Sequence, residues 1–186
     1  MEDKELIWKE LSRRELLKTP VLSVNETDSI SPDGQKGNYI VIDARDWCAV
    51  IPEIDDDFLM VKQWRHGAQC LSIEFPGGVI DDGEKPEEAA RRELLEETGY
   101  KTDDLIYLGT VSPNPALFSN HMHFFLARNL TATGIQDLDN DEYLNYLRIS
   151  KKEVIEKMGC EEYPHALMSV ALNFYNQYCS KTSKKH

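Results

Sequence analysis

The chain has 186 residues, a formal net charge of −12 at pH 7, 41% hydrophobic residues and 29% charged residues. These values predict one globular domain of ordinary size with room for a hydrophobic core. The acidic balance argues against nucleic acid as a partner, because no basic stripe is present to neutralise phosphates. No apolar run approaches the roughly 18 residues of a membrane-spanning helix, and the charged N-terminus is unlike a signal peptide.

The four cysteines lie far apart in the sequence, with no C-x-x-C pair and no histidine at zinc spacing; they are Cys48, Cys70, Cys160 and Cys179. This pattern is typical of free thiols in a reducing compartment. We therefore expect a cytoplasmic protein without membrane contacts.

The first part of the chain predicts one helix followed by strands. Residues 4–18 are expected to form a short helix that ends at Thr19-Pro20, and residues 31–34 (SPDG) form a turn. Strands or extended segments, bounded by turn residues and rich in β-branched and aromatic side chains, are expected at residues 20–30, 39–43, 48–54, 58–65 and 71–75.

The stretch 78–100, GVIDDGEKPEEAARRELLEETGY, predicts a helix with an unusual charged face. Pro86 suits the first helical position, and Gly99 suits the left-handed position just past the end. At about 100° per residue, one side of this helix carries Ala89, Ala90, Glu93, Leu94 and Glu97. Small alanines allow close approach to a sheet, while carboxylates take the place of packing residues.

Glu93, Glu96 and Glu97 fall within little more than one turn, so their charges repel unless a cation is present. A hard divalent cation with oxygen ligands, Mg²⁺ or Mn²⁺ before zinc, is the natural counterion. Gly77 allows a close backbone approach, which would add a main-chain carbonyl ligand. Arg92 reaches Glu88 or Glu96 at four residues' distance and would orient a ligand.

Two interpretations of this acidic helix differ in function. A run such as EEAARRELLEE is commonly a solvated surface helix. However, Gly78, Glu84, Arg92-Glu93-Leu94, Glu96-Glu97, Gly99 and Tyr100 match every fixed position of the Nudix box, G-x5-E-x7-R-E-U-x-E-E-x-G-U, where U is a bulky apolar residue. The chain thus resembles the Nudix hydrolase family over residues 48–178. The resemblance implies hydrolysis of a nucleoside diphosphate joined to another group.

Further strands are expected at residues 105–111, 122–129 and 143–149. Ser150 and Glu153 have the spacing of a capping box for a helix that reaches about Met158. Pro164 opens a last helix through Tyr178. His165, directly after Pro164, is a candidate either for capping that helix or for contacting substrate.

These elements predict an α/β fold, and the resemblance implies an α/β/α sandwich with a mixed sheet. Residues 1–43 resemble the small β-rich extension of the ADP-ribose pyrophosphatase branch, where it builds a homodimer and contributes to the adenine pocket. Residues 44–180 are then the hydrolase domain, and residues 181–186 form a basic tail.

Three residues outside the box resemble the same branch. Pro115 lies sixteen residues beyond Gly99, although a plain turn explains it as well. Arg65, in Gln63-Trp64-Arg65, would contact the substrate's phosphates or terminal ribose; alternatively, it ends a strand in water. Glu74 would bind substrate hydroxyls or support the metal, or would form a structural pair with Arg65.

A second acidic run, residues 137–142, corresponds to the mobile loop in which this branch places its water-activating glutamate. Glu142 is the corresponding residue, and Asp141 is the alternative within the loop. Glu93 or Glu96 acting as the general base is a further alternative.

The sequence therefore predicts a Mg²⁺-dependent pyrophosphatase that cleaves ADP-ribose or a similar nucleotide sugar to AMP and a sugar phosphate. Catalytic roles are expected for Glu142, Glu93 and Arg92. Another nucleoside diphosphate derivative (GDP-mannose, NADH), a nucleoside triphosphate, or binding without catalysis by a sensor are the alternatives.

Overall fold

The computed structural model describes residues 2–134, 136–138 and 143–183. It divides the chain into two compact units. The first comprises Met1–Asp46 with Ser112–His121, and the second comprises Trp47–Val111 with Met122–His186. The second unit contains the segment with the Nudix-like pattern.

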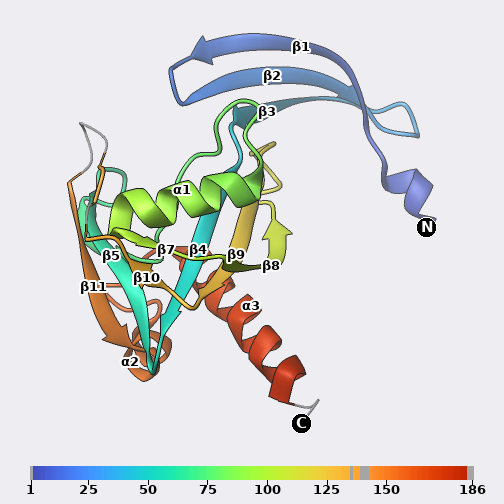
Figure 1. Ribbon diagram of the computed structural model, residues 1–186. Coiled ribbons are helices and arrows are strands. Elements are labelled where there is room, and N and C mark those ends of the chain that lie inside the picture. The colour runs from blue at the N-terminus through green and yellow to red at the C-terminus, as the bar shows by residue number, and fades with distance from the viewer. Residues whose placement is uncertain (1, 135, 139–142, 184–186) are drawn as a thin grey trace. The chain divides into compact units, whose positions relative to one another are not determined.

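The first unit holds an antiparallel three-stranded sheet of order β1-β2-β3 (Figure 1). Its elements are the 3-10 helix η1 (Asp3–Leu6), β1 (Lys9–Lys18), β2 (Leu22–Ile30) and β3 (Lys36–Ala44). The helix expected over residues 4–18 is wrong beyond η1, because β1 pairs with β2 along its length. Strand pairing here overrides the helix propensity of a Glu-, Leu- and Arg-rich segment.

The second unit is built on a mixed six-stranded sheet of order β11-β5-β4-β9-β8, with β6 beside β5. Strands β4 and β9 run parallel, and the other paired neighbours are antiparallel. The strands are β4 (Trp47–Ile54), β5 (Asp57–Arg65), β6 (Cys70–Glu74), β8 (Asp104–Val111), β9 (Met122–Arg128) and β11 (Leu144–Ser150). A small two-stranded sheet joins β7 (Tyr100–Lys101) to β10 (Thr131–Ala132).

Helices α1 (Pro86–Thr98) and α3 (Ala166–Thr182) cover opposite faces of this sheet, and α2 (Lys151–Lys157) follows β11. Successive side chains of β4 point to opposite faces of the sheet, one covered by α1 and the other by α3. Cys48 and Val50 pack in the cluster that contains α1 alanines, whereas Ala49 and Ile51 pack in the cluster that contains α3 side chains. The expected α/β sandwich with a mixed sheet is confirmed.

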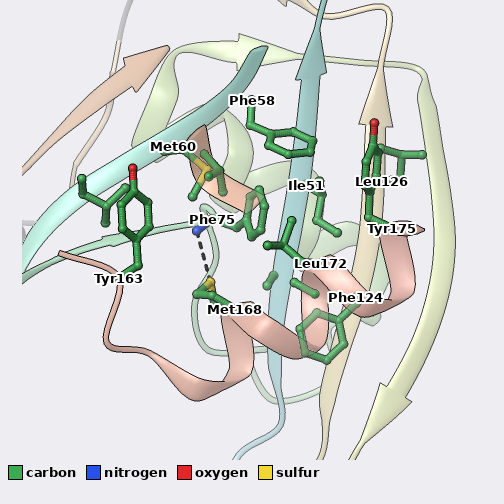
Figure 2. Packing of buried hydrophobic residues seen from close by; sticks show 14 of the residues in the cluster. Ile51, Phe58, Met60, Phe75, Phe124, Leu126, Tyr163, Met168, Leu172 and Tyr175 are labelled. Carbon is green, nitrogen blue, oxygen red and sulfur yellow. Dashed lines mark hydrogen bonds between the residues drawn. The ribbon is translucent and has the colours of Figure 1, made fainter. Parts of the chain in front are cut away.

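The larger core cluster lies between the sheet and α3 (Figure 2). Phe58 meets Phe75 and Tyr175 edge to face, with ring centroids 5.3 and 5.0 Å apart. The Phe75 backbone N–H donates to Met168 Sδ at 3.2 Å. These contacts fix the end of β6 and the start of α3 relative to each other.

The predicted boundaries of the later elements are largely confirmed. Ser150 caps α2, since its Oγ accepts from the Glu153 N–H at 3.2 Å. The last helix begins at Ala166 rather than at Pro164, and His165 is its N-cap. Within the described part of the chain, no helix combines the length and the apolar character needed to cross a membrane.

Candidate functional site

Helix α1 is delimited by local chemistry at both ends. Pro86 opens it, and the Glu88 carboxylate accepts from the Lys85 backbone N–H at 3.3 Å, which satisfies a donor at the helix start. Gly99 ends it with φ of 69°, a left-handed conformation. Both limits agree with those predicted from the sequence.

The turn before α1 requires glycine at two successive positions. Gly77 has φ of +154°, and a Cβ there would overlap the Cys48 carbonyl. A Cβ on Gly78 would overlap the Glu93 carboxylate. The Gly77 N–H donates to Glu97 Oε2 at 2.8 Å, so the turn and the helix are joined by a charge-assisted hydrogen bond.

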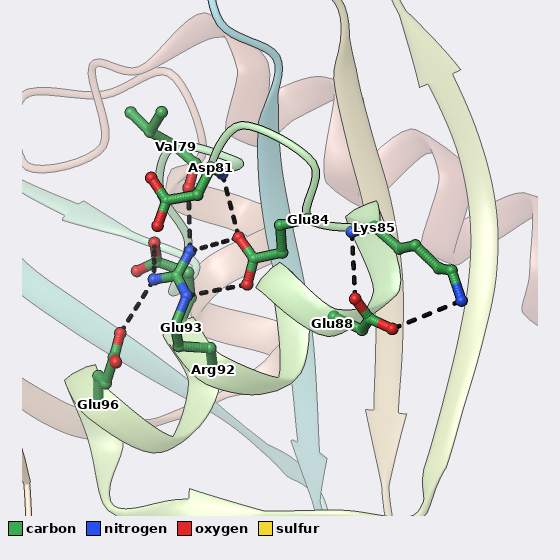
Figure 3. Close-up of polar contacts among 8 residues, drawn as sticks. All are labelled: Val79, Asp81, Glu84, Lys85, Glu88, Arg92, Glu93 and Glu96. Carbon is green, nitrogen blue, oxygen red and sulfur yellow. Dashed lines mark hydrogen bonds and ion pairs between the residues drawn. The ribbon is translucent and has the colours of Figure 1, made fainter.

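Arg92 connects three carboxylates through one guanidinium group (Figure 3). It donates to both oxygens of Glu84 at 3.0 and 2.9 Å, to Glu93 Oε1 at 2.9 Å and to Glu96 Oε2 at 3.0 Å. The sequence predicts Glu88 or Glu96 as the partner of Arg92. Arg92 contacts Glu96, whereas the Glu88 carboxylate pairs with Lys85 Nζ at 3.6 Å. The contact with Glu84 was not expected, although Glu84 is a fixed position of the motif.

These contacts shift the ionisation of both partners. Hydrogen bonds from Arg92 hold the pKa of the Glu84 carboxyl below its usual value. The same pairing with Glu84 raises the pKa of the Arg92 guanidinium. The guanidinium is therefore a permanent positive charge among the acids of the loop and the helix.

Glu93 and Glu97 are 7% and 2% exposed, so the interpretation of α1 as a solvated surface helix is wrong for these two residues. Glu96 lies closer to solvent, with 34% of its side chain exposed. Burying carboxylates costs free energy unless cations or hydrogen bonds compensate. Gly77 and Arg92 supply part of that compensation.

The donor set fits a hard divalent cation, because the acidic side chains and the carbonyl of the glycine turn offer only oxygen. Over the described residues, however, no group of three or more His, Cys, Asp or Glu is arranged to hold a metal ion. In this structure Glu93 Oε1 and Glu96 Oε2 both accept hydrogen bonds from Arg92 Nη1.

A pocket of about 720 Å³ opens beside Gly77 and Gly78. Its walls come from β4, β5, β6, the glycine turn, Met122 of β9 and the start of α3. Most of the lining is apolar, including Trp47, Phe75 and Met168. An apolar pocket with a few polar groups at one wall has the usual composition of a small-molecule site.

Arg65 and Glu74 form that polar wall. Arg65 donates to the two Glu74 oxygens at 2.8 and 2.6 Å. The Glu74 side chain is 2% exposed, whereas 41% of the Arg65 side chain is exposed. Burial opposes ionisation of Glu74, but the bonds and charge of Arg65 hold its pKa below the ordinary value. The structural pair considered from the sequence is therefore present, and Arg65 also lines the pocket.

The remaining predicted site residues lie elsewhere. Pro115 belongs to the segment 112–121 of the first unit, within a turn in which the Leu117 and Phe118 N–H groups donate to the Asn114 carbonyl. Glu142 and its alternative Asp141 fall outside the described residues. The assignment of the general base stays a prediction.

Comparison with known proteins places the chain in a family. The NUDIX domain model matches residues 44–165, and the chain belongs to this family. The chain is 26% identical over 173 residues to the ADP-ribose pyrophosphatase of Bacillus subtilis, covering 92% of this chain and 94% of that protein. It is 34% identical over 98 residues to the ADP compounds hydrolase NudE of Escherichia coli, covering 53% and 51% of the two chains.

A solved structure described as an ADP compounds hydrolase has the same fold. It superposes with a TM-score of 0.84 over 94% of this chain and 95% of that chain, at 24% sequence identity. Nudix hydrolases generally use divalent metals, in agreement with the oxygen-rich donor set of α1.

Proposed function

We propose that the protein is a Mg²⁺-dependent hydrolase that cleaves the pyrophosphate bond of ADP-ribose or a similar nucleotide sugar, giving AMP and a sugar phosphate. One observation carries this proposal: buried Glu93 and Glu97 lie at a glycine turn that opens into a pocket of about 720 Å³. The names of the relatives from Bacillus subtilis and Escherichia coli support the choice of an ADP compound. A mouse relative described as an ADP-sugar pyrophosphatase is 45% identical over 65 residues, which cover 35% of this chain and 30% of that protein.

Glu93, Glu96, Glu97 and the carbonyl of Gly77 would hold the metal. When bound, such an ion neutralises phosphate charge and lowers the pKa of a bound water. Arg92 keeps the Glu93 and Glu96 carboxylates at fixed positions through its two Nη1 hydrogen bonds. In this scheme its contribution to catalysis is the positioning of acids.

Substrate binding and water activation are assigned to other residues. Arg65 lines the pocket and would bind phosphate oxygens, while Glu74 fixes the guanidinium by a bidentate pair. Pro115 would shape the substrate site from the loop that contains it. Glu142 would take the proton of the attacking water, with Glu93 or Glu96 as the alternative base.

Turnover of a substrate panel tests the proposed activity. ADP-ribose, GDP-mannose, NADH and a nucleoside triphosphate would be incubated with the protein and Mg²⁺, and phosphorylated products quantified. We expect the highest kcat/KM for ADP-ribose. A preference for the triphosphate would contradict the ADP-ribose assignment, and binding without turnover would identify a sensor.

Glu97→Gln removes one charge from the proposed metal site while keeping an acceptor for the Gly77 N–H. Loss of an outer-shell partner of a metal costs about 10–100-fold in metal affinity or activity, so we expect kcat/KM to fall by about 100-fold on loss of a ligand charge, with little change in Tm. Glu87→Gln is the matched control, because Glu87 is an exposed acid of the same helix that pairs with Arg91. Equal activity of the two variants would refute the metal site.

We further propose a cytoplasmic homodimer. Strand β1 is exposed along all ten residues, and three of them, Leu11, Leu16 and Leu17, are exposed apolar side chains. An exposed edge strand presents unpaired backbone groups, and its three exposed leucines add apolar surface that another chain would cover. The free thiols of the four cysteines fit a reducing compartment. Sedimentation equilibrium would distinguish a dimer from a monomer.

A further inference from the structure

We propose that His165 is a substrate-binding residue whose Nε2–H donates a hydrogen bond to an oxygen atom of the ligand in the 720 Å³ pocket. The identity of the ligand follows from the proposed function, but the assignment of the donor follows from the geometry of this wall. Three observations carry it: the fixed tautomer of the ring, the position of Nε2, and a buried hydroxyl in the same pocket.

The tautomer is fixed by the start of α3. His165 is the N-cap, and its Nδ1 accepts from the Leu167 backbone N–H at 3.2 Å. A ring nitrogen that accepts a hydrogen bond carries no proton, so the proton of the neutral ring is on Nε2. Burial also lowers the pKa of the imidazole, which keeps the ring neutral near pH 7.

The Nε2 atom faces the polar wall of the pocket. It lies 3.9 Å from Glu74 Oε2, which is too long for a hydrogen bond. Both Glu74 oxygens already accept from Arg65. Among the described residues Nε2 has no hydrogen-bond acceptor, although 31% of the side chain is exposed and the residue lines the pocket. The N–H is therefore available to a ligand.

Ser72 supplies an independent indication that a polar ligand group belongs here. It is completely buried and lines the same pocket, and its Oγ has no hydrogen-bond partner among the described residues. The Ser72 hydroxyl also makes a small contribution to the lowered pKa of the Glu74 carboxyl, which places it beside the polar wall. A buried polar atom left unpaired costs free energy that a bound partner removes.

The chemistry of the wall indicates the kind of atom that is recognised. The Glu74 carboxylate is the acceptor of this wall, and both of its oxygens accept from Arg65. Arg65 and His165 offer donors to the pocket, and the Ser72 hydroxyl is able to donate as well. Donors that line one wall match an oxygen-rich group, while the apolar walls accommodate a flat ring. In a nucleotide sugar the matching oxygens belong to phosphate or to sugar hydroxyls, and both accept the same hydrogen bond.

A pair of substitutions separates the two roles of the ring. In His165→Asn, the side-chain oxygen replaces Nδ1 as the helix cap, but no donor reaches the pocket. In His165→Gln, the longer amide places an N–H near the position of Nε2, but the cap is lost. The proposal therefore predicts weaker binding in His165→Asn and lower stability in His165→Gln. If His165 had only a structural role, affinity and stability would fall together in the same variant.

The measurements are ADP-ribose binding by calorimetry without divalent metal, steady-state kinetics with Mg²⁺, and Tm. For His165→Asn we expect the dissociation constant and KM to rise about tenfold, the loss of one hydrogen bond, with kcat and Tm close to wild type. For His165→Gln we expect a lower Tm with near-normal affinity. Competition by AMP and by ribose 5-phosphate identifies the half of the substrate that His165 contacts, because only that half is weakened by His165→Asn.

Each result decides the assignment. Weakened affinity for either half in His165→Asn, with retained Tm, supports it. Wild-type affinity in His165→Asn overturns it, as does a loss of affinity that follows Tm in both variants. If the wild-type protein binds ADP-ribose and the Asn variant binds equally well, only His165 is misassigned; if the wild-type protein does not bind ADP-ribose, the proposed function fails with it.

Discussion

At the scale of single residues, the site is held by ion pairs of unequal exposure. The pair between Arg65 and Glu74 is the most asymmetric, because the carboxylate is buried and the guanidinium reaches solvent. Exposed pairs contribute little to stability, whereas a buried carboxylate without its partner is strongly unfavourable. Glu74 therefore links the stability of the protein to the orientation of a pocket residue.

Because Glu74 is ionised in this pair, the free energy of unfolding should depend on pH. The folded-state pKa of Glu74 is depressed from the reference value of 4.5, so its contribution is present above about pH 4.5 and is lost as the pH falls through the folded-state pKa. Glu74→Gln should lower the free energy of unfolding at pH 7 by about 1–2 kcal/mol, a value reduced for the exposure of Arg65.

Urea denaturation between pH 3 and pH 7 measures this effect. The Glu74→Gln curve should lose less stability on acidification than the wild-type curve. Glu162→Gln is the control, since Glu162 pairs with Lys62 at an exposed position. Parallel curves for wild-type and Glu74→Gln proteins would contradict the linkage.

At the scale of elements, α1 lies close to the sheet because its buried face carries small side chains. Ala89 and Ala90 are fully buried in the cluster with Cys48 and Val50 of β4. This close approach places Glu93, one turn later, against the glycine turn. The packing of the helix and the positions of its acids are thus set by the same face.

Ala90→Leu tests this dependence. The larger side chain has no space in the cluster, so we expect a loss of about 1–3 kcal/mol of stability and a fall in kcat/KM from the displaced carboxylates. Glu87→Leu adds a leucine on the exposed side of the helix and should change both quantities little. Chemical denaturation and kinetics of the two variants provide the comparison.

Helix α1 is predicted well from the sequence, whereas strand β1 is not. Proline, glycine and the spacing of apolar residues define α1 locally, so the sequence predicts both its limits and its buried acids. Strand β1 takes its conformation from pairing with β2, and a Glu- and Leu-rich sequence carries no local signal of that partner. The contact of Arg92 with Glu84 and the position of His165 in the pocket wall likewise depend on the tertiary fold.

At the scale of the whole molecule, negative charge dominates. With a net charge of −12, the folded chain repels itself, and added salt screens that repulsion. The surface ion pairs are weakened by salt as well, but each contributes little. Stability at neutral pH is therefore expected to increase with ionic strength.

Differential scanning calorimetry in 10 mM and 300 mM NaCl checks this expectation. At pH 7 we expect a higher Tm in the higher salt. At pH 5, close to the sequence pI of about 4.8, the net charge is small and the salt effect should nearly vanish. An equal salt effect at the two pH values would show that net charge does not limit stability.

The guanidinium of Arg92 has a consequence for how this sequence can change over generations. Since it donates to Glu84, Glu93 and Glu96 together, replacing any one of these acids removes a hydrogen-bond acceptor from Arg92, and replacing Arg92 removes a charged donor from all three acids at once. We therefore expect these four residues to vary together. A substitution at one of them should be tolerated only when the others change to compensate, so functional descendants of this sequence should keep all four.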